Sequence, residues 1–185
     1  MAVTTLDPHS ALVLIDLQKG ITAMPSAHPM QEVVDRSARL ATAFRLRRLP
    51  VVLVNVKGGA PGRTEVSLGG GADRPADWAE LRPELDVQGT DILITKQQWG
   101  AFYGTALDLE LRRRGVTQIV LGGVATSFGV ESTARAAYDR GYHVTVVSDA
   151  VTGPDAGTHR HSLEDVFPLL GETGTTEEVL ALLGP

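Results

Sequence analysis

The sequence predicts an α/β domain in which helices cover both faces of a mainly parallel sheet. First, short apolar segments recur along the chain without alternating polar residues, which is typical of strands buried on both faces. Second, segments with helical spacing lie between most of them, as in repeated right-handed βαβ units. Third, 185 residues are enough for one domain with a sizeable core. We therefore expect a single domain over residues 1–185.

Five apolar segments are expected to form the strands. Val, Ile and Leu dominate most of them, and the last is rich in β-branched residues, which favour strands. The segments are residues 11–15, 51–56, 91–95, 118–121 and 143–147.

Helices are expected between and after these strands. Within residues 31–48, the residues Val33, Ser37, Leu40 and Phe44 recur at helical spacing. The other helices are expected at residues 105–114, from about 130 to 141, at about 159–170 and at 177–183.

The helix at residues 105–114 carries end signals of its own. Thr105 and Asp108 resemble a capping box, and Gly115 is a natural C-terminal stop.

Composition narrows the classes of function. The formal net charge of −5 argues against a nucleic-acid surface, and no apolar run is long enough to span a bilayer. Residues 1–8 lack the basic and apolar regions of a signal peptide. The absence of cysteine excludes disulfides, thiolate catalysis and cysteine metal sites. We expect a cytoplasmic protein that binds a small molecule and neither nucleic acid nor membrane.

Polar residues follow three of the predicted strands. In doubly wound sheets, ligands bind beyond the carboxyl ends of the strands. Asp16 and Gln18 follow the first strand, Lys96 follows the third, and the segment "GGVATSFGVESTARAAY" follows the fourth. We expect Asp16 and Lys96 to form a catalytic pair and Gln18 to contact the substrate.

The chemistry of Asp16 and Lys96 depends on their surroundings. Burial at a strand end raises the pKa of a carboxyl group, which suits it to proton transfer, whereas a nearby lysine lowers that pKa. The lysine could also stabilise a developing anion. Taken singly, Asp16 could instead cap a turn and Lys96 could be a solvated side chain. The pair is more informative than either residue.

The segment 122–138 resembles a strand–turn–helix junction that exposes a nucleophile at a helix N-terminus. The residue at the apparent turn, however, is Gly129, which has no side chain.

Several other residues are candidates for binding the substrate. Trp99 and Phe102 could wall a pocket for a planar apolar molecule or belong to the core, and we expect at least one to line the pocket. Arg63, in the long segment 57–89, is a further candidate. His159 and His161 diverge on a helix, so no metal site is expected.

The segment 57–89 is long, rich in glycine and weakly periodic. Long segments of this kind act as lids, binding loops or interfaces, and disorder is the alternative. We expect part of it, including Trp78, to be buried between subunits of a dimer or larger homo-oligomer.

Three motifs together resemble the isochorismatase-like hydrolase superfamily. They are "LVLIDLQKG" at residues 12–20, "TKQQWGAFYGT" at 95–105 and "GGVATSFGVESTARAAYDRGY" at 122–142, and the resemblance covers about residues 10–170. It implies a three-layer α/β/α fold with a six-stranded, mainly parallel sheet of order 3-2-1-4-5-6, and an oligomer. It also implies a non-proline cis peptide at Val124–Ala125, with the amides of Ala125 and Gly129 forming an anion hole.

The resemblance also bears on mechanism. Most members use an Asp–Lys–Cys triad to hydrolyse amides; Asp16 and Lys96 match the first two, and the cysteine position falls on Gly129. Isochorismatases of the phenazine-pathway type lack that cysteine and protonate a vinyl ether, so Asp16 would be the acid. The nicotinamidase metal motif is absent after the second strand, so neither metal nor cofactor is implied.

Two functions from different classes remain open. The first is a hydrolase that cleaves a small carboxylated vinyl ether, similar to isochorismate, without a covalent nucleophile. The second is a catalytically inactive member that binds a small molecule or a protein partner. Retention of both Asp16 and Lys96 favours the hydrolase, because a pure binder has no need of that buried pair.

Overall fold

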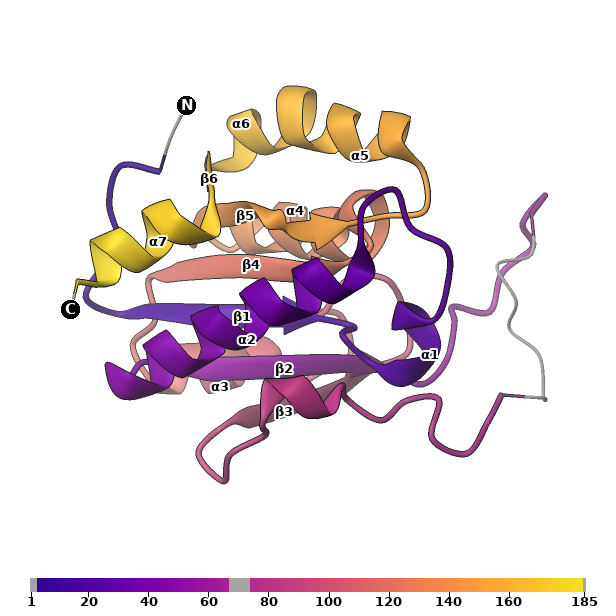
Figure 1. Ribbon diagram of the computed structural model, residues 1–185, viewed down its shortest axis with the longest axis horizontal. Coiled ribbons are helices and arrows are strands. Elements are labelled where there is room, and N and C mark those ends of the chain that lie inside the picture. The colour runs from indigo at the N-terminus through magenta and orange to yellow at the C-terminus, as the bar shows by residue number, and fades with distance from the viewer. Residues whose placement is uncertain (1–2, 67–73, 185) are drawn as a thin grey trace.

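Six parallel strands pair in the order β3-β2-β1-β4-β5-β6 (Figure 1). This confirms the predicted strand order. The computed structural model describes residues 3–66 and 74–184. Its strands are β1 (Ser10–Ile15), β2 (Val51–Val56), β3 (Ile92–Lys96), β4 (Gln118–Val124), β5 (His143–Thr152) and β6 (Glu172–Gly174).

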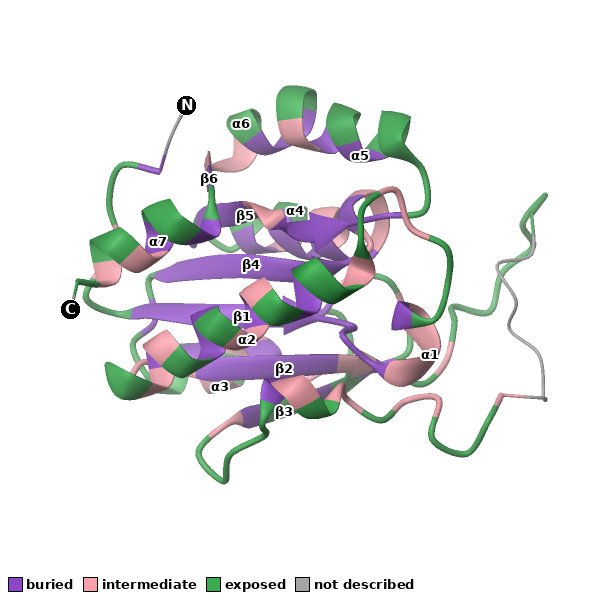
Figure 2. Cartoon of the chain, viewed as in Figure 1, coloured by how far each residue is buried: buried purple, intermediate pink, exposed green. Residues whose placement is uncertain are grey.

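The central strands are buried on both faces, which explains why their sequences do not alternate. Every residue of β1 and β4 is buried (Figure 2). The edge strand β3 does alternate: Ile92, Ile94 and Lys96 are buried, whereas Leu93 is 60% exposed. One face of β3 is therefore left uncovered by helices.

Helices form a layer on each face of the sheet, as predicted (Figure 1). One core lies between the sheet and α2 and α7, and it includes Phe44 and Val179. The other lies between the sheet and α3, α4 and α6, and it includes Leu111 and Phe167. The α-helices are α1 (Lys19–Thr22), α2 (Met30–Leu46), α3 (Leu107–Arg113), α4 (Glu131–Asp139), α5 (Ala156–His161), α6 (Phe167–Leu170) and α7 (Thr176–Leu183). None of the helices within residues 3–66 and 74–184 is long and apolar enough to cross a membrane.

Some element ends differ from the prediction. β4 and β5 continue past their predicted ends to Val124 and Thr152. The helical segment predicted at 159–170 begins at Ala156, because the Asp155 side chain caps it by accepting from the Thr158 amide at 2.8 Å. It includes a π-helical turn, Ser162–Val166. The three-residue strand β6 had no apolar run to reveal it.

The predicted capping box at Thr105 and Asp108 is wrong. Helix α3 begins at Leu107, and the Thr105 hydroxyl donates to the Ala101 carbonyl at 2.5 Å. The Asp108 carboxylate instead accepts from the Tyr142 hydroxyl at 2.8 Å. The Asp108 side chain, which a capping box would need, is thus used in a hydrogen bond to another element.

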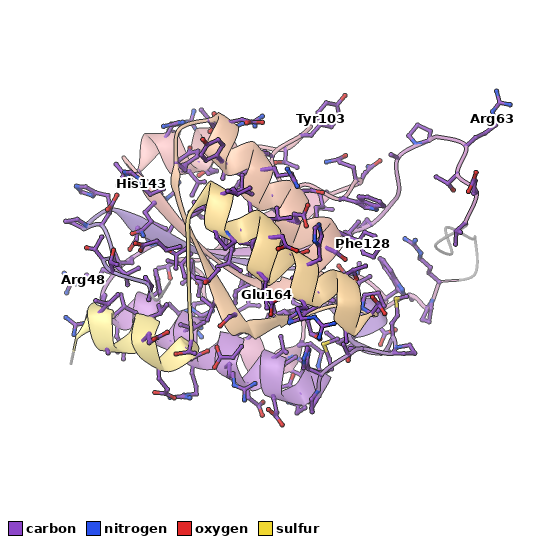
Figure 3. All side chains as sticks on the ribbon, turned by 90° about the horizontal axis from the view of Figure 1, so that it is seen from above. Arg48, Arg63, Tyr103, Phe128, His143 and Glu164 are labelled. Atoms are coloured by element: carbon purple, nitrogen blue, oxygen red, sulfur yellow. The ribbon has the colours of Figure 1, made fainter. Side chains whose placement is uncertain are left out.

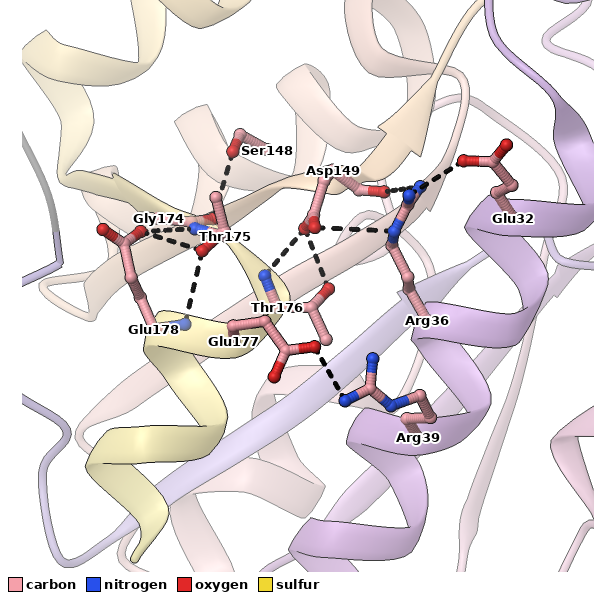
Figure 4. A network of polar contacts seen from close by, with 10 residues as sticks. All are labelled: Glu32, Arg36, Arg39, Ser148, Asp149, Gly174, Thr175, Thr176, Glu177 and Glu178. Atoms are coloured by element: carbon pink, nitrogen blue, oxygen red, sulfur yellow. Dashed lines mark hydrogen bonds and ion pairs between the residues drawn. The ribbon is translucent and has the colours of Figure 1, made fainter.

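A capping box is present at the start of α7, where Thr175 and Glu178 bond reciprocally (Figure 4). Beside it, Asp149 of β5 accepts from the Thr176 amide and hydroxyl at 2.7 and 2.8 Å, and its other oxygen lies 3.5 Å from Arg36 Nε of α2. These contacts hold the two helices of this layer to the same strand.

The long segment between β2 and β3 contains a 3₁₀ turn at Pro83–Leu85. Part of the segment, around Trp78, packs against other residues of the same chain. Trp78 lies directly on Gly20, where a Cβ would come within 2.0 Å of the ring. The Arg74 guanidinium covers the same ring at 3.9 Å from its centroid. Trp78 therefore has partners within its own chain, and its burial between subunits stays a prediction. Residues 67–73 of this segment lie outside the described residues.

Candidate active site

Asp16 is the first residue beyond β1 and lies at the carboxyl edge of the sheet. Its amide donates to Val54 O at 2.9 Å, and the residue is only 5% exposed. Its φ is 51°, in the left-handed region that a short polar side chain such as aspartate tolerates. This conformation ends strand β1, and the carboxyl group that follows the strand is buried.

Lys96 reaches Asp16 from the end of β3. Because β2 lies between β3 and β1, the two backbones are two strand spacings apart, and only a long side chain spans that gap. Lys96 Nζ lies 2.7 Å from Asp16 Oδ2, and it also donates to Gln98 O at 3.1 Å and Trp99 O at 2.7 Å. These three bonds use every donor of the ammonium group, so Lys96 serves Asp16 and has none left for a ligand.

The Asp16 carboxyl group is poised between its two protonation states. Burial raises its pKa to about 6, and the Lys96 ammonium, which lowers that pKa, offsets burial only in part. Asp16 Oδ1 is buried and has no hydrogen-bond partner. One oxygen is thus fixed by Lys96 while the other is free to carry or accept a proton.

The turn after β4 brings Gly129 to this carboxyl group. The Val124–Ala125 peptide is cis, as the resemblance implied, and a π-helical turn, Thr126–Val130, leads straight into α4. An ideal Cβ on Gly129 would lie 3.4 Å from Asp16 Oδ2. Position 129 therefore faces Asp16, and the turn of the predicted strand–turn–helix junction is π-helical.

Gly123 permits this close approach of β4 to β1. Its φ is +109°, a conformation that side chains rarely adopt. A Cβ at this position would lie 2.1 Å from Ile15 O. The glycine thus lets the end of β4 pass beside the residue that precedes Asp16.

The two aromatic candidates lie in different places. Trp99 is 53% exposed and packs on Phe128 with 4.9 Å between ring centroids, beside the lysine that its own carbonyl binds. Phe102 is 4% exposed and packs on Tyr142 in the core. Trp99 thus lies at the edge of the site, whereas Phe102 lies in the core, and contact of either ring with a substrate stays a prediction.

Gln18 makes hydrogen bonds within the fold, and its contact with a substrate stays a prediction. Its amide nitrogen donates to Val56 O and Trp78 O, each at 3.1 Å, and its oxygen accepts from the Val56 amide at 2.7 Å. The side chain is fully buried. These bonds join the ends of β1 and β2 to the following loop, so the fold itself uses the amide.

Arg63 and Ala125 complete the predicted set. Figure 3 shows Arg63 at the far end of an extended arm, pointing away from Phe128 and the rest of the domain, so the chain does not bring it to Asp16. Ala125 is half-buried directly before the turn, and its carbonyl accepts from the Val130 amide at 3.2 Å. The anion hole at the Ala125 and Gly129 amides stays a prediction.

No cluster of three or more His, Cys, Asp or Glu side chains suited to a metal occurs among residues 3–66 and 74–184. The two histidines of α5 do diverge: His159 is buried, and His161 is exposed and lies 2.8 Å from Asp165.

Two neighbours of the site were missed. Phe128 directly precedes Gly129, and an aromatic side chain at that place is a signal for a pocket wall. His159 shares the inward face of its helix with Ser162 and Val166, at spacings of three and seven residues. A polar residue at such a position is itself a signal.

The family model of the isochorismatase domain matches residues 10–178. The chain belongs to the isochorismatase family. Members of this family are hydrolases, so the chain is an isochorismatase-like hydrolase.

Similar proteins support this family assignment. The isochorismatase family protein YwoC of Bacillus subtilis is 45% identical over 92% of both chains. The solved structure of an isochorismatase family protein from Burkholderia thailandensis is 44% identical, covers 100% of both chains and superposes with a TM-score of 0.94. A ureidoacrylate amidohydrolase, RutB of Methylobacterium radiotolerans, is 30% identical over 90% of this chain and 76% of its own length.

Proposed function

We propose that this isochorismatase-family protein hydrolyses a small carboxylated vinyl ether, similar to isochorismate, with Asp16 as the proton donor and without a covalent nucleophile. One observation carries the proposal: where most of the family is expected to hold a cysteine, Gly129 faces the carboxyl group of Asp16, whose Oδ2 binds Lys96 and whose Oδ1 has no hydrogen-bond partner. A nucleophile is missing at the position where a poised acid is present.

The acid mechanism needs only Asp16, Lys96 and water. Protonated Asp16 transfers its proton to the terminal carbon of the double bond, which gives an oxocarbenium ion on the substrate. Water adds to that cation and loses a proton to the Asp16 carboxylate, and the hemiketal collapses to an alcohol and a ketone. The proton is returned, so Asp16 is regenerated. The Lys96 ammonium stabilises the carboxylate during the interval when it is ionised.

The rest of the site suits a small, partly planar substrate. Trp99 and Phe128 present ring faces at the edge of the pair, and aromatic rings favour flat apolar groups. The Ala125 amide is the group that we assign to a substrate carboxylate. Neither metal nor cofactor enters this mechanism.

Amide hydrolysis, as the name of the RutB relative indicates for that protein, has less support here. It proceeds most readily through a covalent nucleophile. The Ser127 hydroxyl donates to Thr158 at 3.4 Å, and Ser132 lies against Gly100, so neither serine faces Asp16. The alternative of an inactive binding protein has still less support. A buried ion pair with one unsatisfied oxygen lowers stability, and a protein that only binds a ligand does not need such a pair.

The test is a panel of vinyl ethers and amides assayed with the wild type, Asp16→Asn and a control, Asp139→Asn, whose carboxylate is exposed on α4. We expect the wild type to cleave a vinyl ether and Asp16→Asn to lose about 10²- to 10⁴-fold in kcat, while calorimetry shows that substrate still binds. Asp139→Asn should match the wild type. Full activity of Asp16→Asn would contradict the mechanism, and a wild type that binds panel members but turns over none would indicate the inactive binder.

A further inference from the structure

The turn that carries Gly129 is held at both ends by threonine hydroxyls. Thr133, one helical turn later, donates its hydroxyl to Gly129 O at 2.7 Å and accepts from the Ala101 amide at 3.1 Å. Thr126 begins the turn and is fully buried, and its hydroxyl lies 2.8 Å from His159 Nδ1. The second anchor comes from α5, which also contacts the turn through Thr158, the acceptor of the Ser127 hydroxyl at 3.4 Å.

His159 is suited to this contact because its surroundings favour the neutral imidazole. Burial lowers its pKa, and the nearby His28 lowers it further. In a neutral imidazole one nitrogen donates and the other accepts, so the tautomer sets whether Nδ1 donates to the threonine hydroxyl or accepts from it. The imidazole therefore satisfies a buried hydroxyl that an apolar side chain of the same size would leave without a partner.

His159 also connects the turn to a third segment. The His28 ring lies against it with centroids 4.5 Å apart, and His28 Nδ1 lies 3.1 Å from the Thr152 hydroxyl at the end of β5. The Ala27 amide donates to Gly153 O at 2.8 Å beside this contact. The connection between α1 and α2, the end of β5 and the turn after β4 thus meet at one imidazole.

We propose that His159 is a positioning residue for the reaction: through Thr126 it fixes the Thr126–Val130 turn and so keeps the space between position 129 and Asp16 constant. The inference rests on the acid role proposed for Asp16. The tolerance is small, because a Cβ at position 129 would lie only 3.4 Å from Asp16 Oδ2, and a displacement of about 1 Å in an active site can cost about 10²-fold in rate.

Paired substitutions separate positioning from simple packing. His159→Asn places an amide where Nδ1 stands and keeps a partner for Thr126, whereas His159→Leu fills similar volume without one. Thr126→Val removes the same hydrogen bond from the other side, and it replaces His159→Leu if that variant does not fold. His161→Leu, on the exposed face of the same helix, is the matched control.

The first measurement does not depend on activity. Asp16 is titrated by carbon NMR of its carboxyl group in each variant. A loosened turn admits water to Asp16, so its pKa should move from about 6 towards the ordinary value near 3.9 in His159→Leu and Thr126→Val. His159→Asn and His161→Leu should keep the wild-type value. Unchanged titration in both His159→Leu and Thr126→Val would overturn the proposal, whatever the protein's substrate.

The second measurement uses a vinyl ether that the wild type cleaves. We expect His159→Leu to lower kcat by roughly 10- to 100-fold with KM nearly unchanged, and His159→Asn to restore most of the loss. Equal losses in His159→Leu and His159→Asn would indicate that the imidazole acts only through packing and would overturn the proposal. If no vinyl ether is cleaved, the acid mechanism fails while the titration still decides the role of His159.

Discussion

Position 129 and Asp16 are in van der Waals contact range: a Cβ on Gly129 would lie 3.4 Å from Asp16 Oδ2 and 3.0 Å from Ile15 Cγ2. A side chain at this position would therefore compete for space with the carboxyl group itself. The glycine leaves that space to a substrate atom or to water. The same geometry makes position 129 and the protonation of Asp16 the two places where the mechanism can be tested most directly.

The pH dependence of kcat/KM distinguishes an acid from a base at Asp16. The acid must be protonated, and burial raises the pKa of Asp16 to about 6. We therefore expect kcat/KM for a vinyl ether to be constant at lower pH and to fall about tenfold per pH unit above about 6. A stopped assay over pH 4.5–8.5 measures this profile. A rate that instead rises through pH 6 would identify Asp16 as a base that activates water.

Substituting the lysine should shift the stability of the protein in a pH-dependent way. An aspartate whose folded pKa is raised binds more protons in the folded state, so the free energy of unfolding falls as pH rises from about 3.9 to the folded pKa. In the wild type this loss ends near pH 6, the pKa of Asp16. In Lys96→Met the ammonium no longer lowers that pKa, so the loss should continue above pH 6, at about 1.4 kcal/mol per pH unit until the new pKa is reached.

Urea unfolding of both proteins at pH 5, 6, 7 and 8 measures this difference. Lys96→Met also leaves the Gln98 and Trp99 carbonyls without their donor, which lowers stability equally at every pH. The diagnostic quantity is therefore the slope above pH 6. Parallel curves for the two proteins would show that Lys96 does not control Asp16.

Adding one methyl group at position 129 should destabilise the protein. Ile15 is fully buried in β1 and branched at Cβ, so its Cγ2 cannot easily move away from a Cβ placed 3.0 Å distant. We expect Gly129→Ala to cost about 1–3 kcal/mol in unfolding free energy, reduced by up to about 1 kcal/mol from the better helix propensity of alanine. Gly89→Ala is the control, because no atom lies within 4 Å of its Cβ position. Thermal unfolding of both variants provides the measurement, and equal midpoints would disprove the crowding.

The fold was predictable because its signals are local, whereas part of the site was not. Uninterrupted apolar runs revealed β1 and β2, since these central strands are buried on both faces. The pairing of Asp16 with Lys96 followed from the convergence of strand ends in a parallel sheet. The sequence could not reveal that Gln18 and Phe102 point into the fold, because a side chain near a strand end can turn into the fold as readily as towards a ligand, and only its tertiary partners decide which. The contact of His159 with the turn could not be predicted, because its partner, Thr126, is remote in sequence.

Self-association remains a prediction, and exposed apolar residues at the edge of the sheet support it in addition to the segment that contains Trp78. The uncovered face of the edge strand β3 exposes Leu93, and Val87 nearby in sequence is 45% exposed. Exposed apolar side chains beside an edge strand are favoured sites for contact with another subunit. We expect light scattering at micromolar concentration to give the mass of a dimer or larger assembly, and Leu93→Lys to shift it towards the monomer. A monomer at all concentrations would contradict this.

Restoring a cysteine at the vacant position tests how closely this site is related to the amidase type. In Gly129→Cys, the thiol would be attached to a Cβ 3.4 Å from Asp16 Oδ2, within reach for proton transfer to the carboxylate. We expect an activated ester to give a burst of one product per protein, and mass spectrometry to show the acyl adduct on Cys at this position. The burst should disappear when Asp16→Asn is added, because no group then accepts the thiol proton. Vinyl ether hydrolysis should fall at the same time, since the sulfur occupies the space that the substrate needs. The wild type, which has no cysteine, should neither burst nor react with iodoacetamide. A variant that folds with its thiol freely alkylated yet shows no burst would mean that the carboxyl group of Asp16 is not directed at position 129.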